Sequence, residues 1–333
     1  MKTSFIKRTV RSKYAALIVV TIVLAALFSI IKPDYLGVDN LKNIMAAMSF
    51  TGTLAVGMSM LLIAGEVDLA AGVEACLCGV ICAMLIQSGL IWPVAIVVTI
   101  LCGAFFGLVN VFFVNVLNIM GFIATIGIMS VFTGIIRVLT SSKSMPVADK
   151  TFWAIGSTKL FGIIPLPFVI MLVLMLVYAF ILNYTSFGRN VYLIGGNRRA
   201  ARLCGVNQKK VVAILYINNG ALAAVAGIVL AARMHSASPM AGSTGALDAI
   251  TVAVLGGVAF IGGIGSLGGV FIGLLLLTVF NVGLTATGFQ SYWQIIAQGA
   301  LLILALSVDF FSENSRRKAL EREEAAVKAT SEN

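Results

Sequence analysis

The chain has 333 residues, of which 60% are hydrophobic and only 11% are charged, and its mean hydropathy is +1.04. Soluble domains carry about a quarter charged residues, so this composition excludes a soluble globular protein and indicates an integral membrane protein. The net charge of +10 does not indicate nucleic-acid binding, because the basic residues cluster beside apolar segments and not among aromatic ones.

The amino-terminal segment combines positive charge with an apolar run. Residues 1–13 are rich in lysine and arginine, and the apolar run 14–31 follows. No clean small-x-small cleavage site comes after that run, which favours an uncleaved membrane span over a secretory signal. We therefore expect a cytoplasmic segment over 1–13, a transmembrane domain over 14–308 and a cytoplasmic tail over 309–333.

The apolar pattern continues along most of the chain. A membrane-spanning helix needs about 20 largely apolar residues. This predicts an all-α polytopic membrane protein with about ten transmembrane helices. The candidate spans are 14–31, 43–64, 69–87, 91–116, 120–140, 163–183, 211–232, 247–262, 266–284 and 290–308.

The distribution of lysine and arginine predicts the orientation in the membrane. An even number of spans places both termini on one side. Most basic residues fall in 1–13, 184–210 and 309–333, and basic residues favour the cytoplasmic side. We therefore expect both termini and the segment 184–210 in the cytoplasm, and the long connection 141–162 outside.

The first interruption of the apolar pattern lies at 64–72, which reads AGEVDLAAG. It places Glu66 and Asp68 between two apolar runs, and Glu74 follows. A carboxylate in lipid is costly, so these acids must face protein, water or a partner. One interpretation is a hinge or gate lining a path near the inner side; the other is a short cytoplasmic turn with solvated acids. We favour the hinge for Asp68 and leave both open for Glu66.

A weak internal repeat links this interruption to a second one. Residues 52–79 and 245–273 share an apolar run, a glycine-bearing break and a second run rich in small residues. Paired interrupted spans often mark a transport path. In the second copy, Asp248 is expected near the outer mouth with Arg233 as a possible partner, or else as an ordinary surface acid.

Nucleotide, metal and hydrolytic chemistry find little support in the sequence. A G-x-G-x-x-G occurs at Gly263, Gly265 and Gly268, but no strand precedes it and no acid lies about 20 residues on. No G-x-x-x-x-G-K-[ST] occurs. Most cysteines lie in apolar runs, as small packing residues do, and His235 is the only histidine. We therefore expect no catalytic residue, no metal and no cofactor.

The polar stretch 188–206 reads GRNVYLIGGNRRAARLCGV and lies between two long apolar runs. A short helix is predicted over 198–204, with Asn197 as its N-cap and Gly205 as its stop. Small side chains would share one face of that helix and leave room for another protein to approach closely; they are Ala200, Ala201 and Cys204.

This stretch resembles the cytoplasmic coupling segment of the ribose-type membrane permeases of ABC sugar importers. The matching positions are Gly188, Arg189, Tyr192, Gly195, Gly196, Asn197, Ala200, Ala201, Arg202, Leu203, Gly205 and Val206. In that family a helix of this segment docks into a groove on a separate ATPase subunit. A basic loop that merely follows the positive-inside bias is the alternative.

Other motifs extend the resemblance from about residue 40 to residue 309. At the first break Asp68, Leu69 and Gly72 match, whereas Glu66, Val67 and Ala70 depart from the commonest form. Residues 122–127 resemble the family's Phe-Ile-Ala-Thr-Leu-Gly motif. Residues 247–250, 255–257 and 262–266 match as well, except that Ile264 stands where the family usually has arginine or lysine.

The resemblance implies a type II-like ABC importer permease of the ribose, xylose, arabinose, galactoside and autoinducer-2 branch. Such a permease is not an enzyme. It works in the bacterial inner membrane with an ABC ATPase, a periplasmic or lipid-anchored solute-binding protein and a second permease, identical or sister. The implied ATPase-coupling residues are Gly188, Arg189, Gly195, Gly196, Asn197, Ala200, Ala201, Arg202 and Gly205. The implied path or gate residues are Glu66, Asp68, Gly72, Thr125, Asp248, Gly256 and Gly257.

A different class of transporter stays open from the residues alone. An ion-coupled secondary transporter of a small solute would need an intramembrane acid that titrates or binds a cation. The candidates for that role are Glu66, Asp68 and Glu74. A membrane enzyme is disfavoured by the shortage of histidine and of clustered polar residues.

Overall fold

The computed structural model describes residues 2–290, 292–304 and 307, with side chains from Tyr14 onward. The fold is helical apart from two pairs of two-residue strands. Its helices are α1 (Lys2–Ile31), η1 (Pro33–Leu36), α2 (Val38–Ile63), α3 (Ala71–Gln87), α4 (Trp92–Val111), the π-helical turn η2 (Phe112–Val116), α5 (Gly121–Thr140), α6 (Lys150–Ser157), α7 (Leu166–Tyr184), α8 (Ser186–Gly196), α9 (Arg198–Leu203), α10 (Gln208–Met234), α11 (Gly245–Leu255) and α12 (Leu267–Ala286). A further helix follows over Tyr292–Leu304.

Seven of the described helices are long and apolar enough to cross a membrane. They are Tyr14–Ile31, α2, α4 with η2, α5, α7, α10 and α12. Three predicted spans are shorter, namely α3, α11 and the helix Tyr292–Leu304, so the expected count of about ten spanning helices is not confirmed. The hydropathy pattern overestimated the lengths of the helices at 69–87 and 247–262. The apolar pattern continues there through residues whose backbone is not helical, 69–70 and 256–262.

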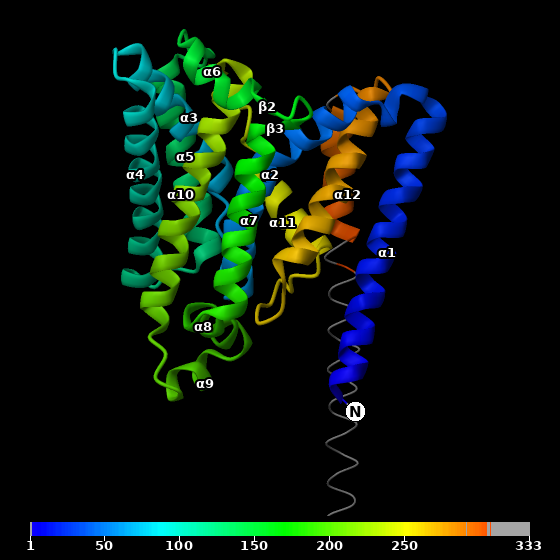
Figure 1. The fold of residues 1–333 in the computed structure, drawn as a ribbon. Coiled ribbons are helices and arrows are strands. Elements are labelled where there is room, and N and C mark those ends of the chain that lie inside the picture. The colour runs from blue at the N-terminus through cyan, green and yellow to red at the C-terminus, as the bar shows by residue number, and fades with distance from the viewer. Residues whose placement is uncertain (1, 291, 305–306, 308–333) are drawn as a thin grey trace, which may run out of the picture.

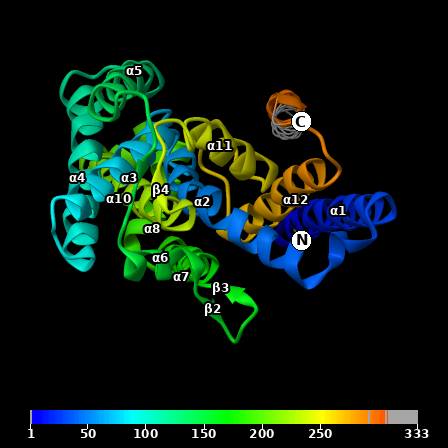
Figure 2. The ribbon, with the colours of Figure 1, turned by 90° about the horizontal axis from the view of Figure 1, so that it is seen from above.

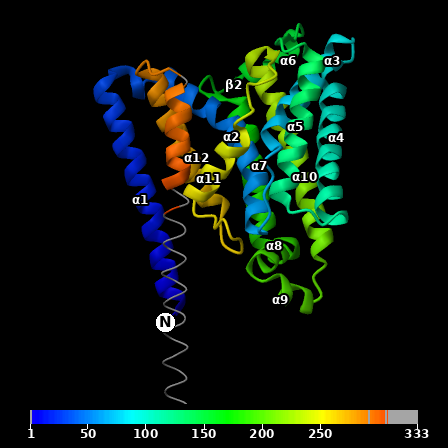
Figure 3. The same ribbon diagram turned by 180° about the vertical axis from the view of Figure 1, so that it is seen from behind.

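Helix α10 packs against α2, α3 and α4, and α2 also packs against α7, α11 and α12 (Figures 1 and 3). Seen from above, α4 and α5 lie at one side, α1 and α12 at the other, and α2 and α11 between them (Figure 2). The helices α8 and α9 lie at one end of the bundle, and α6 lies at the other (Figure 1).

The α6 end is closed by short, locally stabilised elements. Strand β1 (Met145–Pro146) pairs antiparallel with β4 (Ser236–Ala237), and β2 (Lys159–Leu160) pairs with β3 (Ile164–Pro165). Asp149 caps α6, and the hydrogen bonds it accepts, led by that from the Thr151 side chain, lower the pKa of its carboxyl group. The Trp153 ring stacks on the His235 ring with centroids 4.4 Å apart.

Glycine allows α4 and α10 to pack backbone to backbone. A Cβ added to Gly220 would collide with the Gly103 carbonyl oxygen, and one added to Gly103 would collide with that of Gly220. A Cβ on Gly107 would likewise collide with the Tyr216 carbonyl. Association of helices in lipid depends on such close van der Waals contact at small residues.

We expect Gly220→Ala to destabilise the protein by about 1–3 kcal/mol, because its methyl group forces α4 and α10 apart. Gly127→Ala in α5 is the matched control, since a Cβ there meets no atom within 4 Å. The measurement is the midpoint of unfolding in a denaturing-detergent titration. Equal midpoints for the wild type and Gly220→Ala would contradict the close contact.

Candidate functional site

The α2–α3 break, residues 64–70, is a non-helical stretch inside the bundle. Helix α2 ends at Ile63, and Gly65 takes the left-handed conformation with φ +74°. Glu66 is 7% exposed and Asp68 is fully buried. The interpretation of a turn with solvated acids therefore does not fit either side chain.

Asp68 ties this break to two long helices. Its Oδ2 accepts hydrogen bonds from Nδ2 of Asn110 in α4 at 3.1 Å and from Nδ2 of Asn219 in α10 at 2.9 Å. Its Oδ1 accepts from the backbone N–H of Ala70 at 3.0 Å. Neither asparagine is among the site residues predicted from the sequence, although a single amide in an apolar helix is a signal of a polar contact inside a membrane bundle.

Two other predicted path residues lie close to this break: Thr125 contacts it from α5, and Gly72 lies in the first turn of α3 directly after it. The buried Thr125 in α5 accepts a hydrogen bond at Oγ1 from the backbone N–H of Leu69 at 3.1 Å. A Cβ added to Gly72 would lie 2.7 Å from the Gly242 carbonyl oxygen and 3.0 Å from the Gly245 nitrogen. Glycine at 72 therefore lets the start of α3 approach the start of α11.

The α11–α12 break, residues 256–266, is the second interruption. Gly256 packs against the backbone of Gly269 in α12, and Gly257 takes φ +86°. Asp248 is half-buried, and its Oδ2 lies 3.4 Å from the Thr244 hydroxyl oxygen. Among the described residues no ion pair joins Asp248 to Arg233, and the Arg233 guanidinium donates to the Ala46 carbonyl at 3.0 Å.

The carboxyl end of α8 contacts both breaks. A Cβ on Gly195 would collide with the Ile63 carbonyl, and that same carbonyl accepts a hydrogen bond from the Gly263 N–H at 2.8 Å. A Cβ on Gly263 would lie 2.7 Å from the Gly196 Cα. The Tyr192 hydroxyl donates to the Gly265 carbonyl at 2.8 Å. We call this meeting of α8 with the two breaks the glycine junction.

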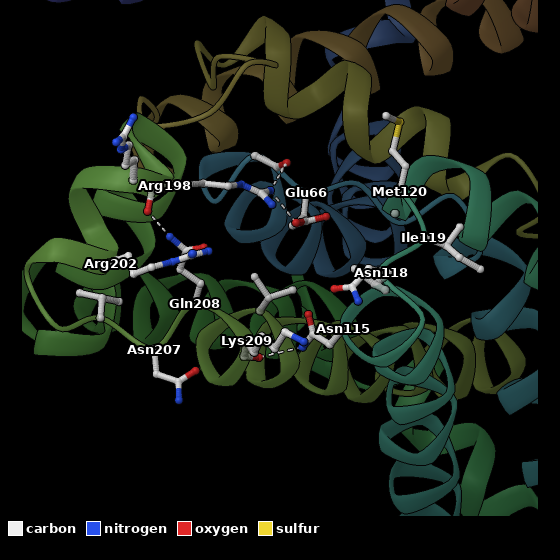
Figure 4. A pocket seen from close by; sticks show the side chains of 16 residues that line it. Glu66, Asn115, Asn118, Ile119, Met120, Arg198, Arg202, Asn207, Gln208 and Lys209 are labelled. Carbon is white, nitrogen blue, oxygen red and sulfur yellow. Dashed lines mark hydrogen bonds and ion pairs between the residues drawn. The ribbon is translucent and has the colours of Figure 1, made fainter.

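An ion pair adds a direct connection from α9 to the α2–α3 break. The Arg198 guanidinium lies 2.6 Å from Glu66 Oε1 and donates to the Gly65 carbonyl at 3.2 Å (Figure 4). The Tyr216 hydroxyl contacts Glu66 Oε2 at 3.4 Å and the Val67 carbonyl at 3.0 Å. Arg198, the first residue of α9, is therefore fixed to Gly65 and Glu66 of the α2–α3 break.

This ion pair borders a large cavity at the α8–α9 end. The cavity has a volume of about 1270 Å³, and Figure 4 shows side chains from the break, the α4–α5 connection, α9 and the start of α10 around it. Its lining includes Glu66, Asn118, Met120, Arg202, Gln208 and Lys209. The cavity is thus predominantly basic, and Glu66 contributes its one acidic side chain among the lining residues.

Helix α9 forms as the sequence predicts, but its exposed face differs. The Asn197 side chain accepts from the Ala200 N–H at 3.0 Å, and Gly205 takes φ +78° after the last turn. Ala201 is fully buried, so the predicted small-residue face is not presented as one surface. The exposed tip instead includes Arg202 and Leu203, whose exposed fraction is 83%.

Of the remaining coupling candidates, one is buried in a helix contact and two are exposed to solvent. Gly188 is buried against the end of α7, where a Cβ would collide with the Leu182 carbonyl. Arg189 and Gly196 are exposed. The predicted segment therefore contains both an internal contact with the breaks and an outward-facing tip.

The model of the branched-chain amino acid transport system / permease component family matches residues 40–306. The chain is 34% identical to the ribose import permease protein RbsC of Escherichia coli K12, over 88% of this chain and 92% of the relative. It is 31% identical to the xylose transport system permease protein XylH of Haemophilus influenzae, over 89% and 95% respectively. The chain belongs to the ribose-type sugar permeases of ABC importers.

A third relative is the galactose/methyl galactoside import permease protein MglC of Escherichia coli K12. It is 34% identical to this chain, over 89% of this chain and 94% of MglC. No solved structure matches the chain. The permease family is one of transport proteins and not of enzymes.

Removing either member of the Glu66–Arg198 pair should have unequal effects on stability. The side chain of Glu66 is 8% exposed and that of Arg198 is 55% exposed. Arg198→Met leaves a buried carboxylate without its cation and should cost about 1–3 kcal/mol or more. Glu66→Gln leaves a guanidinium that water can solvate, so its cost should be below about 1 kcal/mol.

The measurement is again the unfolding midpoint of the purified permease. Arg199→Met serves as the control, because it removes an exposed arginine from the same helix. Equal effects of Arg198→Met and Arg199→Met would show that the ion pair does not stabilise the break.

Proposed function

We propose that this permease translocates a sugar or sugar-like polar solute from a solute-binding protein to the cytoplasm, by alternating access driven by a separate ABC ATPase. The observation that carries the proposal is the glycine junction together with the Glu66–Arg198 pair. Through them α8 and α9 contact both interrupted helices. A force applied to α9 would therefore reach the α2–α3 break and the α11–α12 break directly.

The ATPase would dock on the exposed tip of α9. Arg202 and Leu203 present a charged and an apolar side chain there, outside the packed core. The buried Ala201 packs this short helix against the bundle, and the Asn197 cap closes its first turn. A rigid docking helix is required for a push at its surface to move the breaks.

The solute is inferred from the relatives and from the polarity of the breaks. The printed names of the relatives refer to ribose, xylose and galactose. The side chains that contact the α2–α3 break, Asn110, Asn219 and Thr125, carry amide and hydroxyl groups of the kind that bind a neutral polyhydroxylated solute. The binding protein would deliver it at the α6 end, and a second permease, identical or sister, would complete the pathway.

We place the permease in the bacterial inner membrane with both termini in the cytoplasm, because the basic residues gather in 1–13, 184–210 and 309–333. In this proposal α3 and α11 cross the membrane together with their non-helical neighbours, and the helix Tyr292–Leu304 marks a further crossing. The total would then reach about ten crossing segments. The tail 309–333 lies outside the described residues.

We predict that Leu203→Asp reduces both copurification of the ATPase and its stimulation by loaded binding protein at least tenfold, a loss of about 1.4 kcal/mol of coupling. Leu203 is 83% exposed, so the change should leave the permease folded. Leu36→Asp, an exposed leucine in η1 at the other end of the bundle, is the control for copurification of the ATPase (Figure 1). Normal stimulation of the ATPase by the Leu203→Asp permease would refute docking at this tip.

The native cysteines allow the orientation to be tested without engineering a reporter. Cys204 is exposed beside α9, whereas Cys76, Cys78 and Cys82 are buried. A membrane-impermeant maleimide should label Cys204 in inverted vesicles and not in intact spheroplasts. Cys204→Ser should abolish the label. Labelling of intact spheroplasts would overturn the proposed orientation.

The ion-coupled transporter remains the second candidate, and the burial of Asp68 and Glu74 is the observation that favours it. The two functions differ in their energy source. Reconstituted alone in vesicles with a proton or sodium gradient, the permease should accumulate no ribose, xylose or galactose. With its ATPase, binding protein and ATP it should accumulate one of them. Accumulation driven by the ion gradient alone would favour the second candidate.

A further inference from the structure

A second acid joins Asp68 in the interior of the bundle. The side chains of Asp68, Glu74, Asn110 and Asn219 are all fully buried. Asn110 Nδ2 donates both to Asp68 Oδ2 at 3.1 Å and to Glu74 Oε1 at 2.9 Å. We call these four side chains the buried carboxylate cluster.

The two carboxylates are close enough to repel strongly. Because both accept from the same nitrogen, Asp68 Oδ2 and Glu74 Oε1 cannot be more than about 6 Å apart. In the described part of the chain neither carboxylate has an ion-pair partner, whereas Glu66 is paired with Arg198. Two uncompensated charges at this separation and depth are strongly unfavourable.

The surrounding hydrogen-bond donors compensate one of the two charges. Asp68 accepts from two amide side chains and from the Ala70 N–H, directly before the amino-terminal end of α3. The partial positive charge of the α3 amino terminus acts on both acids, because Glu74 lies in its first turn. Glu74 accepts only from the amide that Asp68 already uses. Glu74 is therefore the carboxylate whose charge lacks compensation.

The unpartnered atoms of the cluster are acceptors and not donors. Glu74 Oε2, Asn110 Oδ1 and Asn219 Oδ1 are buried without a hydrogen-bond partner. In a carboxylate or amide the two terminal atoms are about 2.2 Å apart. The unpartnered Glu74 Oε2 and Asn110 Oδ1 therefore lie next to Glu74 Oε1 and Asn110 Nδ2, the two atoms that form the hydrogen bond between these side chains. What the cluster lacks is positive charge and proton donors.

The neighbouring helices supply no other group that could provide the charge. The titratable side chains close to the two acids are Cys78 on α3 and Tyr216 on α10, and Cys102 on α4 lies near Cys78. Thiols and phenols are largely neutral at pH 7. Glu66, the nearest acid on the break, is occupied by Arg198.

We propose that the buried carboxylate cluster is a binding site for one monovalent cation, either a proton carried by Glu74 or a sodium ion held between the two carboxylates. The cation brings the cluster to the single negative charge that its donors compensate, and it gives the unpartnered oxygens a partner. Because Asp68 belongs to the α2–α3 break, the cation would help to hold this break against α4 and α10. The site does not depend on the identity of the transported solute.

The first experiment separates a proton from a sodium ion in the wild-type permease. Infrared spectra in sodium-free buffer at pH 7 should show the C=O stretching band of a protonated carboxylic acid if Glu74 carries a proton. Glu74→Gln should remove that band. Glu66→Gln is the matched control and should leave it, because the carboxylate it removes is paired with a guanidinium.

The second experiment detects sodium through stability. Unfolding is followed in sodium chloride and in choline chloride at equal ionic strength. A sodium concentration of 100 times Kd should shift the folding equilibrium about 100-fold, and Glu74→Gln should lose this shift. A carboxylic-acid band that depends on Glu74 supports the proton, and a sodium-specific shift that depends on Glu74 supports sodium. The absence of both in the folded permease would overturn the proposal.

Asp68→Asn keeps the test decisive if Glu74→Gln fails to fold. With one carboxylate left, the cluster already has a single negative charge and no longer needs the cation. The acid band should then titrate away at a lower pH than in the wild type, or the sodium-specific shift should be lost. A response identical to that of the wild type would contradict a shared site.

Discussion

The hydrogen bonds of Asp68 are the contacts on which the interior of this permease depends. An unwound backbone inside a membrane bundle is tolerated only where protein or water satisfies its polar groups. Asp68 provides this in two directions, locally through the Ala70 N–H and across the bundle through Asn110 and Asn219. Thr125 adds a partner for the Leu69 N–H. The α2–α3 break is therefore a fixed feature of the fold and not a frayed helix end.

The same break is also held from the α8–α9 end, by contacts of a different kind. There the close contacts are made by glycine backbone, because Gly195 and Gly262 come so near to Ile63 and Gly65 that a Cβ would not fit. Gly263 packs in the same way against Gly196. Tight packing of this kind transmits displacement, since there is no side chain that could rotate to absorb it. The break is thus connected by polar contacts to α4 and α10 and by steric contacts to α8.

The local elements around the coupling segment could be predicted from the sequence, because capping is a property of neighbouring residues. Asn197 and Gly205 set the ends of α9 as expected. The exposed face of α9 could not be predicted, because the burial of Ala201 depends on the rest of the bundle. The partners of Asp68 were missed for a similar reason. Asn110 and Asn219 lie 42 and 151 residues away along the chain, and no local pattern relates them.

The Glu66–Arg198 pair shows how departures from the family pattern are accommodated in this chain. Glu66 is not the commonest residue of the family's motif at the first break, and Arg198 is not among the positions that match the coupling segment. Ile264 stands where the family usually has a basic residue, one position after Gly263, which contacts Gly196. In this chain the positive charge near the junction of the breaks comes from Arg198, and it meets a carboxylate that the commonest motif does not place there. The connection between α9 and the α2–α3 break is thus made by an ion pair between two side chains that both lie outside the shared pattern. Its contribution can be measured apart from the glycine contacts, because neither Glu66 nor Arg198 takes part in them.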